Sequence, residues 1–134
     1  MTPRLAHVAV AVDDLAGARR VFSDLLGLPV AHEETVADQG VHTVSLDLAG
    51  GGQIELLEAT GPDTPVGKFL AKRGAGLHHL ALRVDDLEAM LARLAAEGVE
   101  LIDREPRVGA GGCRIAFLHP RSTAGVLVEL IEDA

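Results

Sequence analysis

LAHVAVAVDDL, at residues 5–15, recurs as LHHLALRVDDL at residues 77–87, and seven of the eleven positions are identical. In both copies the segment continues into a stretch whose apolar side chains are spaced three and four residues apart. Gly27 follows this stretch in the first copy and Gly98 follows it in the second. Such spacing, closed by glycine, predicts an amphipathic helix and its end. Each copy therefore begins with a strand that leads into a helix.

The two copies also end alike. IELLE at residues 54–58 closes the first copy and VELIE at residues 128–132 closes the second. Between helix and closing strand each copy has room for two more strands, for which residues 41–48 and 114–118 are the clearest segments. We therefore expect an α+β fold of two tandem βαβββ modules, about residues 4–58 and 77–132, in a single domain of residues 1–134.

The linker of residues 59–76 is expected to contain a short helix. Thr64 is suited to cap it, because Pro65 follows at the first helical position. The Asp13-Asp14 and Asp85-Asp86 pairs stand where each repeated strand meets its helix, and helix capping explains them better than catalysis does.

Composition narrows the class of protein. The chain has 134 residues and a net charge of −8, which disfavours binding to nucleic acid or to an anionic membrane. Cys113 is the single cysteine, so an intrachain disulfide and a thiolate zinc site are excluded. Neither a signal peptide nor a run of membrane-spanning length is evident, and we expect a cytoplasmic protein.

Four residues occupy equivalent places in the two copies: His7 matches His79, and Glu55 matches Glu129. Alone, each would be read as a core histidine or as a glutamate on the solvent side of a strand. As a symmetric set they are persuasive, because two carboxylates in apolar strands are costly unless a cation neutralises them. Two imidazoles and two carboxylates suit a divalent first-row ion with positions left open for substrate. The pattern predicts one metal-binding cleft.

Several segments along nearly the whole chain carry a family resemblance. They resemble the vicinal oxygen chelate superfamily, which has the glyoxalase/bleomycin-resistance-like fold, and within it the methylmalonyl-CoA epimerase family. The segments are HVAVAV (7–12), DQGV (38–41), IELLE (54–58), KFLAKRG (68–74), GLHH (76–79), DREP (103–106) and FLHPRS (117–122).

The resemblance implies an isomerase that interconverts (2R)- and (2S)-methylmalonyl-CoA by metal-assisted α-proton abstraction and reprotonation through an enolate. It also implies an acyl-CoA substrate, a homodimer, and a divalent ion, Co²⁺ first and otherwise Mn²⁺, Zn²⁺, Ni²⁺ or Fe²⁺. Its ligands would be His7, Glu55, His79 and Glu129. Some members carry a glutamate as a proposed base where this chain has Thr43, which leaves one proton-transfer group unidentified.

Two roles remain to be assigned to residues. Because the pseudo-symmetry of the repeat relates the two glutamates, we expect Glu129, and secondarily Glu55, to transfer the proton. We expect contacts to the acyl-CoA from residues that are basic, polar or near the end of a strand: Lys72, Arg73, Arg114, His119 and Ser122.

Three other functions fit a similar pattern. A glyoxalase-type lactoylglutathione lyase shares the fold and the ligands. An extradiol dioxygenase also uses two histidines and one glutamate, but from a single module. A non-catalytic, metal-dependent antibiotic-sequestering protein is the remaining alternative, although an aromatic content of 2% disfavours stacking on a planar drug. Exchange of deuterium into the α-carbon of methylmalonyl-CoA separates an epimerase from all three.

Overall fold

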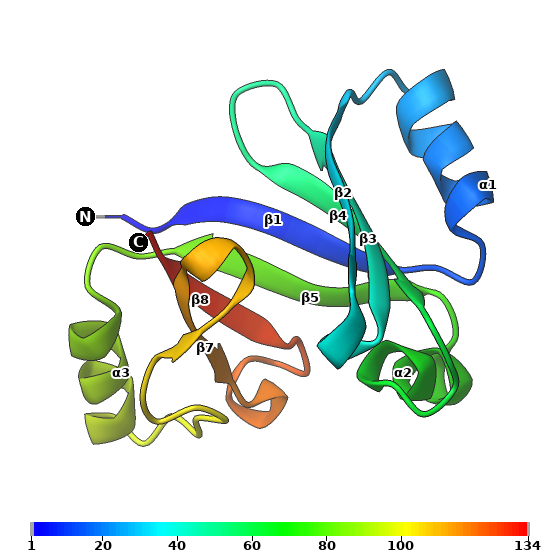
Figure 1. Cartoon of the computed structure of the whole chain (residues 1–134). Coiled ribbons are helices and arrows are strands. Elements are labelled where there is room, and N and C mark those ends of the chain that lie inside the picture. Colours follow the sequence, from blue (N-terminus) through cyan, green and yellow to red (C-terminus); the bar gives the residue numbers. More distant parts are fainter. Residues whose placement is uncertain (1, 134) are drawn as a thin grey trace. The chain divides into compact units, whose positions relative to one another are not determined.

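The computed structural model describes residues 2–133 (Figure 1). Its helices and strands follow the order β-α-β-β-β twice, with α2 between the copies. The strands are β1 (Arg4–Ala11), β2 (Val30–Val36), β3 (Val41–Asp47), β4 (Gln53–Ala59), β5 (Gly76–Arg83), β6 (Arg107–Val108), β7 (Arg114–Leu118) and β8 (Val128–Glu132). The α-helices are α1 (Leu15–Arg19), α2 (Pro65–Arg73) and α3 (Leu87–Ala96). Shorter helical segments are η1 (Arg20–Leu25), η2 (Ala37–Gln39), η3 (Ala110–Gly112) and η4 (Pro120–Ser122).

The chain packs as two compact units, His7–His78 and the described parts of residues 1–6 and 79–134. In the unit His7–His78 the strand order is β2-β3-β4-β1. Strands β1 and β4 run parallel, and β3 is antiparallel to β2 and β4. On one face α1 and η1 cover a core around Leu46 and Leu56, and on the other face α2 packs against Leu57.

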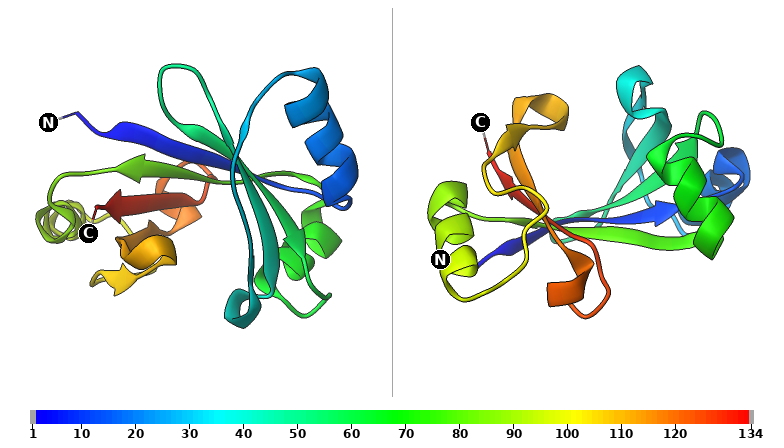
Figure 2. Two further views of the ribbon diagram at one scale, coloured as in Figure 1. Left: turned by 45° about the horizontal axis from the view of Figure 1, so that its top comes forward. Right: turned by 90° about the horizontal axis from the view of Figure 1, so that it is seen from below.

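The second unit repeats this arrangement with the order β5-β8-β7-β6, in which β5 and β8 run parallel. Leu87 and Leu91 of α3 pack against one face of β7 and β8, and Figure 2 gives two further views of these elements. The other face carries Ala81 of β5 and Ile131 of β8. An α+β fold of tandem βαβββ modules is thus confirmed.

Aspartates start both repeated helices. The side chain of Asp14 accepts a hydrogen bond from the Gly17 amide, and that of Asp86 accepts one from the Ala89 amide, each at 3.1 Å. Thr64 caps α2 in the same way. The predicted capping roles are confirmed for Asp14, Asp86 and Thr64, and such caps are standard ways to satisfy the free amides of a first helical turn.

The first repeated helix differs from the simple helix expected after residue 15. It is α-helical only to Arg19 and continues as the π-type segment η1, in which the Leu26 amide donates to the Val21 carbonyl at 2.9 Å. The apolar side chains of the segment still face β3 and β4. None of the described helices is long and apolar enough to span a membrane.

Strand β2 contains a bulge. Val30 pairs with Leu46, but His32 pairs with Ser45, so one extra residue lies between the two paired positions. Beyond the bulge, strand residues face the opposite side of the sheet from the one that regular alternation would give them. Val30 accordingly packs in the core under α1, whereas Val36 packs in the core under α2.

Candidate metal centre

His79 and Glu129 lie on adjacent parallel strands of one unit. Ala81 of β5 pairs with Glu129 of β8, and His79 is two residues before Ala81, so both side chains are on the same face. His79 Nε2 is 3.3 Å from Glu129 Oε1. The two side chains are only 9% and 11% exposed, which makes this a buried imidazole–carboxylate pair.

The surroundings of this pair are mostly apolar. Phe117 of β7 pairs directly with Glu129, and its ring lies edge-on at 6.0 Å from the His79 ring. Ile115 and Ile131 share this face of the sheet, which is the face opposite α3. A carboxylate in such a place requires a cation or a proton donor close to it.

The unit His7–His78 repeats the register. Ala9 of β1 pairs with Glu55 of β4, and His7 is two residues before Ala9. His7 and Glu55 are therefore on one face of adjacent parallel strands, as His79 and Glu129 are. Both residues are half-buried, and Ser45, which pairs with Glu55, is 8% exposed. This is the face away from α1.

Residues in or next to these strands take other positions. His78 faces the opposite side from His79 and packs on Phe69 of α2, with ring centroids 4.8 Å apart. Lys72 and Arg73 form the last turn of α2, and the Arg73 guanidinium lies 5.8 Å from the Phe69 ring centroid. The two basic side chains are exposed.

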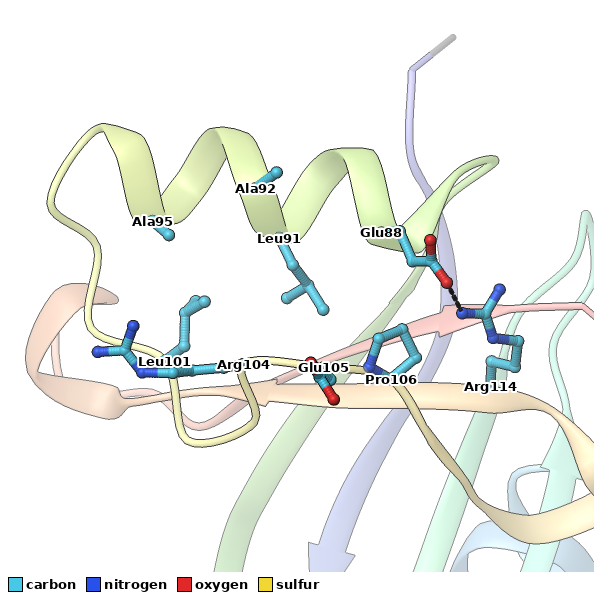
Figure 3. Close-up of a pocket in the computed structure, with 9 residues that line it drawn as sticks. All are labelled: Glu88, Leu91, Ala92, Ala95, Leu101, Arg104, Glu105, Pro106 and Arg114. Carbon is cyan, nitrogen blue, oxygen red and sulfur yellow. Dashed lines mark hydrogen bonds and ion pairs between the residues drawn. The ribbon is translucent and has the colours of Figure 1, made fainter.

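Arg114 lies on the α3 side of its sheet, at the rim of a hollow of about 530 Å³ (Figure 3). Its guanidinium pairs with Glu88 at 2.5 Å and with Glu132 at 3.2 Å. The hydrogen bond that the Arg114 guanidinium donates to the Glu88 carboxylate is the main cause that raises the pKa of Arg114. Leu91 and Leu101 belong to the core under α3, so the hollow is on the opposite face from His79 and Glu129.

His119 and Ser122 are both engaged with Glu100. His119 Nδ1 accepts a hydrogen bond from the Arg121 amide at 3.0 Å and lies 3.6 Å from a Glu100 carboxylate oxygen. Ser122 Oγ accepts from the Glu100 amide at 2.9 Å. These contacts order the turn after β7.

Two further glutamates have a structural role that sequence reasoning missed. Glu58 accepts a hydrogen bond from the Leu15 amide at 2.8 Å, and Glu132 accepts one from the Leu87 amide at 2.5 Å. Each joins the end of a closing strand to the start of the helix of its module. The sequence does contain a sign of this role: the second glutamate of IELLE recurs in VELIE, as the first glutamate does.

Comparison with known proteins gives a family match. The model of the Glyoxalase/Bleomycin resistance protein/Dioxygenase superfamily matches residues 6–117. An uncharacterized protein of Bacillus subtilis, YqjC, is 46% identical over 129 residues, which are 96% of this chain and 91% of the relative.

Two relatives with assigned activities also match over nearly the whole chain. The ethylmalonyl-CoA/methylmalonyl-CoA epimerase of Cereibacter sphaeroides is 39% identical over 132 residues, 97% of this chain and 98% of the relative. A solved structure of a methylmalonyl-CoA epimerase in complex with methylmalonyl-CoA and NH₄⁺ has a TM-score of 0.87 and 39% identity. That likeness covers 100% of this chain and 96% of the other.

Proposed function

The chain belongs to the glyoxalase/bleomycin resistance protein/dioxygenase superfamily, and from this membership we propose that it is a methylmalonyl-CoA epimerase. It interconverts the (2R) and (2S) forms of methylmalonyl-CoA. The observation that carries the proposal is the buried His79–Glu129 pair, whose strand register recurs for His7 and Glu55. Isomerisation is favoured over the lyase, dioxygenase and drug-binding alternatives because the similarity to named epimerases extends over nearly the entire chain.

We propose that His7, Glu55, His79 and Glu129 hold a divalent ion, Co²⁺ first and otherwise Mn²⁺, Zn²⁺, Ni²⁺ or Fe²⁺. The His79–Glu129 pair fits such an ion. Two ligand atoms about 2.1 Å from one ion lie roughly 3.0–3.4 Å apart at ordinary coordination angles. The 3.3 Å between His79 Nε2 and Glu129 Oε1 agrees with this spacing. A bound cation would also offset the cost of burying the Glu129 carboxylate.

A divalent ion, when bound, supplies Lewis-acid stabilisation of the negative charge that develops on the thioester oxygen. The proton itself is moved by the chain. Glu129 takes the proton from the α-carbon on one carboxylate oxygen, and the C–H electron pair passes to the thioester carbonyl. Glu55, related to Glu129 by the repeat, is the second candidate for this role. A proton returned on the opposite side of the carbon completes the epimerisation.

The acyl-CoA requires positive charge despite the acidity of the chain. We propose Lys72 and Arg73 for its phosphates, because both are exposed at the end of α2. Arg114, His119 and Ser122 stay predictions as substrate contacts, since carboxylate or backbone groups of their own unit already engage them. A homodimer in the cytoplasm is the proposed working form.

The deciding experiment follows solvent deuterium into the α-carbon of methylmalonyl-CoA, with the protein loaded with Co²⁺. We expect rapid exchange together with loss of optical purity. In Glu129→Gln both rates should fall by about 100-fold or more, as is typical for removal of a general base. Metal content is measured in parallel.

Two results would count against the proposal. No exchange by the metal-loaded protein would exclude an epimerase. Undiminished exchange by a Glu129→Gln variant that keeps its metal would reject Glu129 as the proton-transfer group and leave the family assignment intact.

A further inference from the structure

The face of the sheet that carries His7 and Glu55 holds other titratable side chains. Ser45 pairs with both Glu55 and His32, and Thr43 pairs with Glu34. Directly paired residues share a face, so His32 and Glu34 of β2 are on the same face as Glu55. Neither His32 nor Glu34 has a role in the proton abstraction proposed for Glu129 and Glu55.

The bulge in β2 is what puts them there. With regular alternation from Val30, Glu34 would share the face of Val30, which packs under α1. The extra residue between Val30 and His32 turns Glu34 to the other face, and Glu33, whose partner is the buried core residue Val44, to the α1 side. Bulges of this kind are over-represented next to active sites, where they re-aim side chains.

His32 and Glu34 form a pair on this face. His32 Nε2 lies 3.6 Å from Glu34 Oε1, and their side chains are 62% and 42% exposed. Between Glu34 and Glu55 lie the short side chains of Thr43 and Ser45. Glu34 lies across from Leu57, and Glu55 lies across from His32. Two strand spacings across the sheet and two residues along it, about 12 Å in total, therefore separate the backbones at positions 34 and 55. This leaves room for a substrate carbon above the short residues, with carboxylates at both sides.

We propose that Glu34 is the second proton-transfer group of the epimerase, assisted by His32. The proposal rests on the proposed function and identifies the group that Thr43 leaves missing. Glu34 acts on the side of the α-carbon opposite the group that removes the proton in the first direction.

The step balances as an exchange of two protons. The group that removes the proton, Glu129 or Glu55, accepts the α-proton of one epimer while the C–H electron pair moves to the thioester carbonyl. Protonated Glu34 then gives its proton to the other side of the same carbon, and the carbonyl is restored. Turnover leaves the group that removed the proton protonated and Glu34 ionised. Exchange with water resets both, with His32 placed to pass a proton to Glu34. The reverse reaction uses the same groups in exchanged roles.

The test measures deuterium incorporation separately from each pure epimer with the Glu34→Gln variant. We expect epimerisation to fall by about 100-fold or more. One epimer should still exchange its α-hydrogen, with retained configuration, because the other proton-transfer group is intact. Glu34→Asp, which keeps a carboxylate, should epimerise faster than Glu34→Gln.

Glu33→Gln is the matched control, since Glu33 is the neighbouring carboxylate on the opposite face and pairs with Arg19. It should leave both exchange rates unchanged. Epimerisation undiminished in Glu34→Gln, or equal loss of exchange from both epimers, would overturn the role of Glu34. Absence of all exchange in the unmodified protein would overturn the proposed function and this role with it.

Discussion

Glu58 and Glu132 each stand three residues after a proposed metal ligand, and each accepts a hydrogen bond from the first amide of a helix. The closing strand of each module is thereby joined to the helix of the same module. Glu132 also pairs with Arg114, whose raised pKa keeps the guanidinium charged throughout the usual working range. The carboxylate is therefore part of a larger polar network than its equivalent Glu58.

Replacement of Glu132 should weaken the fold. We expect Glu132→Ala to lower the free energy of unfolding by about 1–3 kcal/mol, because the Leu87 amide loses its acceptor. Glu132→Gln should lose less, since an amide oxygen can still accept. Urea denaturation followed by circular dichroism measures both. Glu105→Ala, at an exposed glutamate of the same unit, is the control and should change little.

The four proposed ligands could be singled out from the sequence because they repeat in pairs. Glu34 could not, because regular alternation from Val30 puts it on the wrong face and no local signal marks the bulge. His32 lies in an acidic stretch, which predicts an exposed residue but does not predict that it pairs with Glu34. The face of the sheet to which a side chain points depends on the strand pairing, and the paired residues are distant in the sequence.

At the scale of elements, α2 shows how packing overrides helix propensity. Gly67 is buried in its first turns, and a Cβ there would overlap the carbonyl oxygen of Gly61 and crowd the backbone of Pro62. These atoms belong to the backbone, so they have little freedom to move aside. The glycine permits close contact between the helix and the turn before it.

We therefore expect Gly67→Ala to destabilise the protein, although alanine is more favourable than glycine inside a helix by about 1 kcal/mol. Overpacking of this kind typically costs about 1–3 kcal/mol. Thermal and urea unfolding provide the measurement. Ala71→Gly, at an exposed position of the same helix, reports the propensity effect alone. A gain in stability in Gly67→Ala would show that the turn can shift.

Helices could be predicted where the spacing of apolar residues within one segment indicates them. Residues 15–25 were expected to form one helix, and their apolar side chains do face the sheet. The change from α to π hydrogen bonding after Arg19 could not be predicted, because both backbone patterns bury the same residues, such as Phe22. Neither glycine nor proline inside the segment marks the change.

At the scale of the whole molecule, the repeat made the fold predictable. Each unit buries the apolar face of its own helix, and each repeats the same parallel pairing of its first and last strands. The two modules differ in their second strand, and the repeat does not predict this difference. The second strand is Val30–Val36 in one module and only Arg107–Val108 in the other.

If the proposed ion binds the folded protein, stability depends on metal. Removal of divalent ions by a chelator should lower the melting temperature, and Co²⁺ should restore it. At a free concentration 100 times the dissociation constant, a ligand of the folded state contributes about 2.7 kcal/mol. Scanning calorimetry of metal-free and Co²⁺-loaded protein tests this.

The variant control is His79→Ala, which removes a proposed ligand. It should lose most of the Co²⁺-dependent increase in melting temperature. If metal-free and loaded protein melt alike, or if His79→Ala responds to Co²⁺ as the unmodified chain does, the metal proposal is wrong.

Strand β2 is the edge strand of its unit, and this position affects the tendency of the protein to aggregate. A free strand edge invites pairing between molecules, and charged side chains oppose it. Glu33 and Glu34 provide that repulsion together, one on each face of the strand. Loss of both charges, as in a Glu33→Gln/Glu34→Gln double variant, would weaken that repulsion and favour association. The bulged strand thus combines a proposed catalytic role with protection against aggregation.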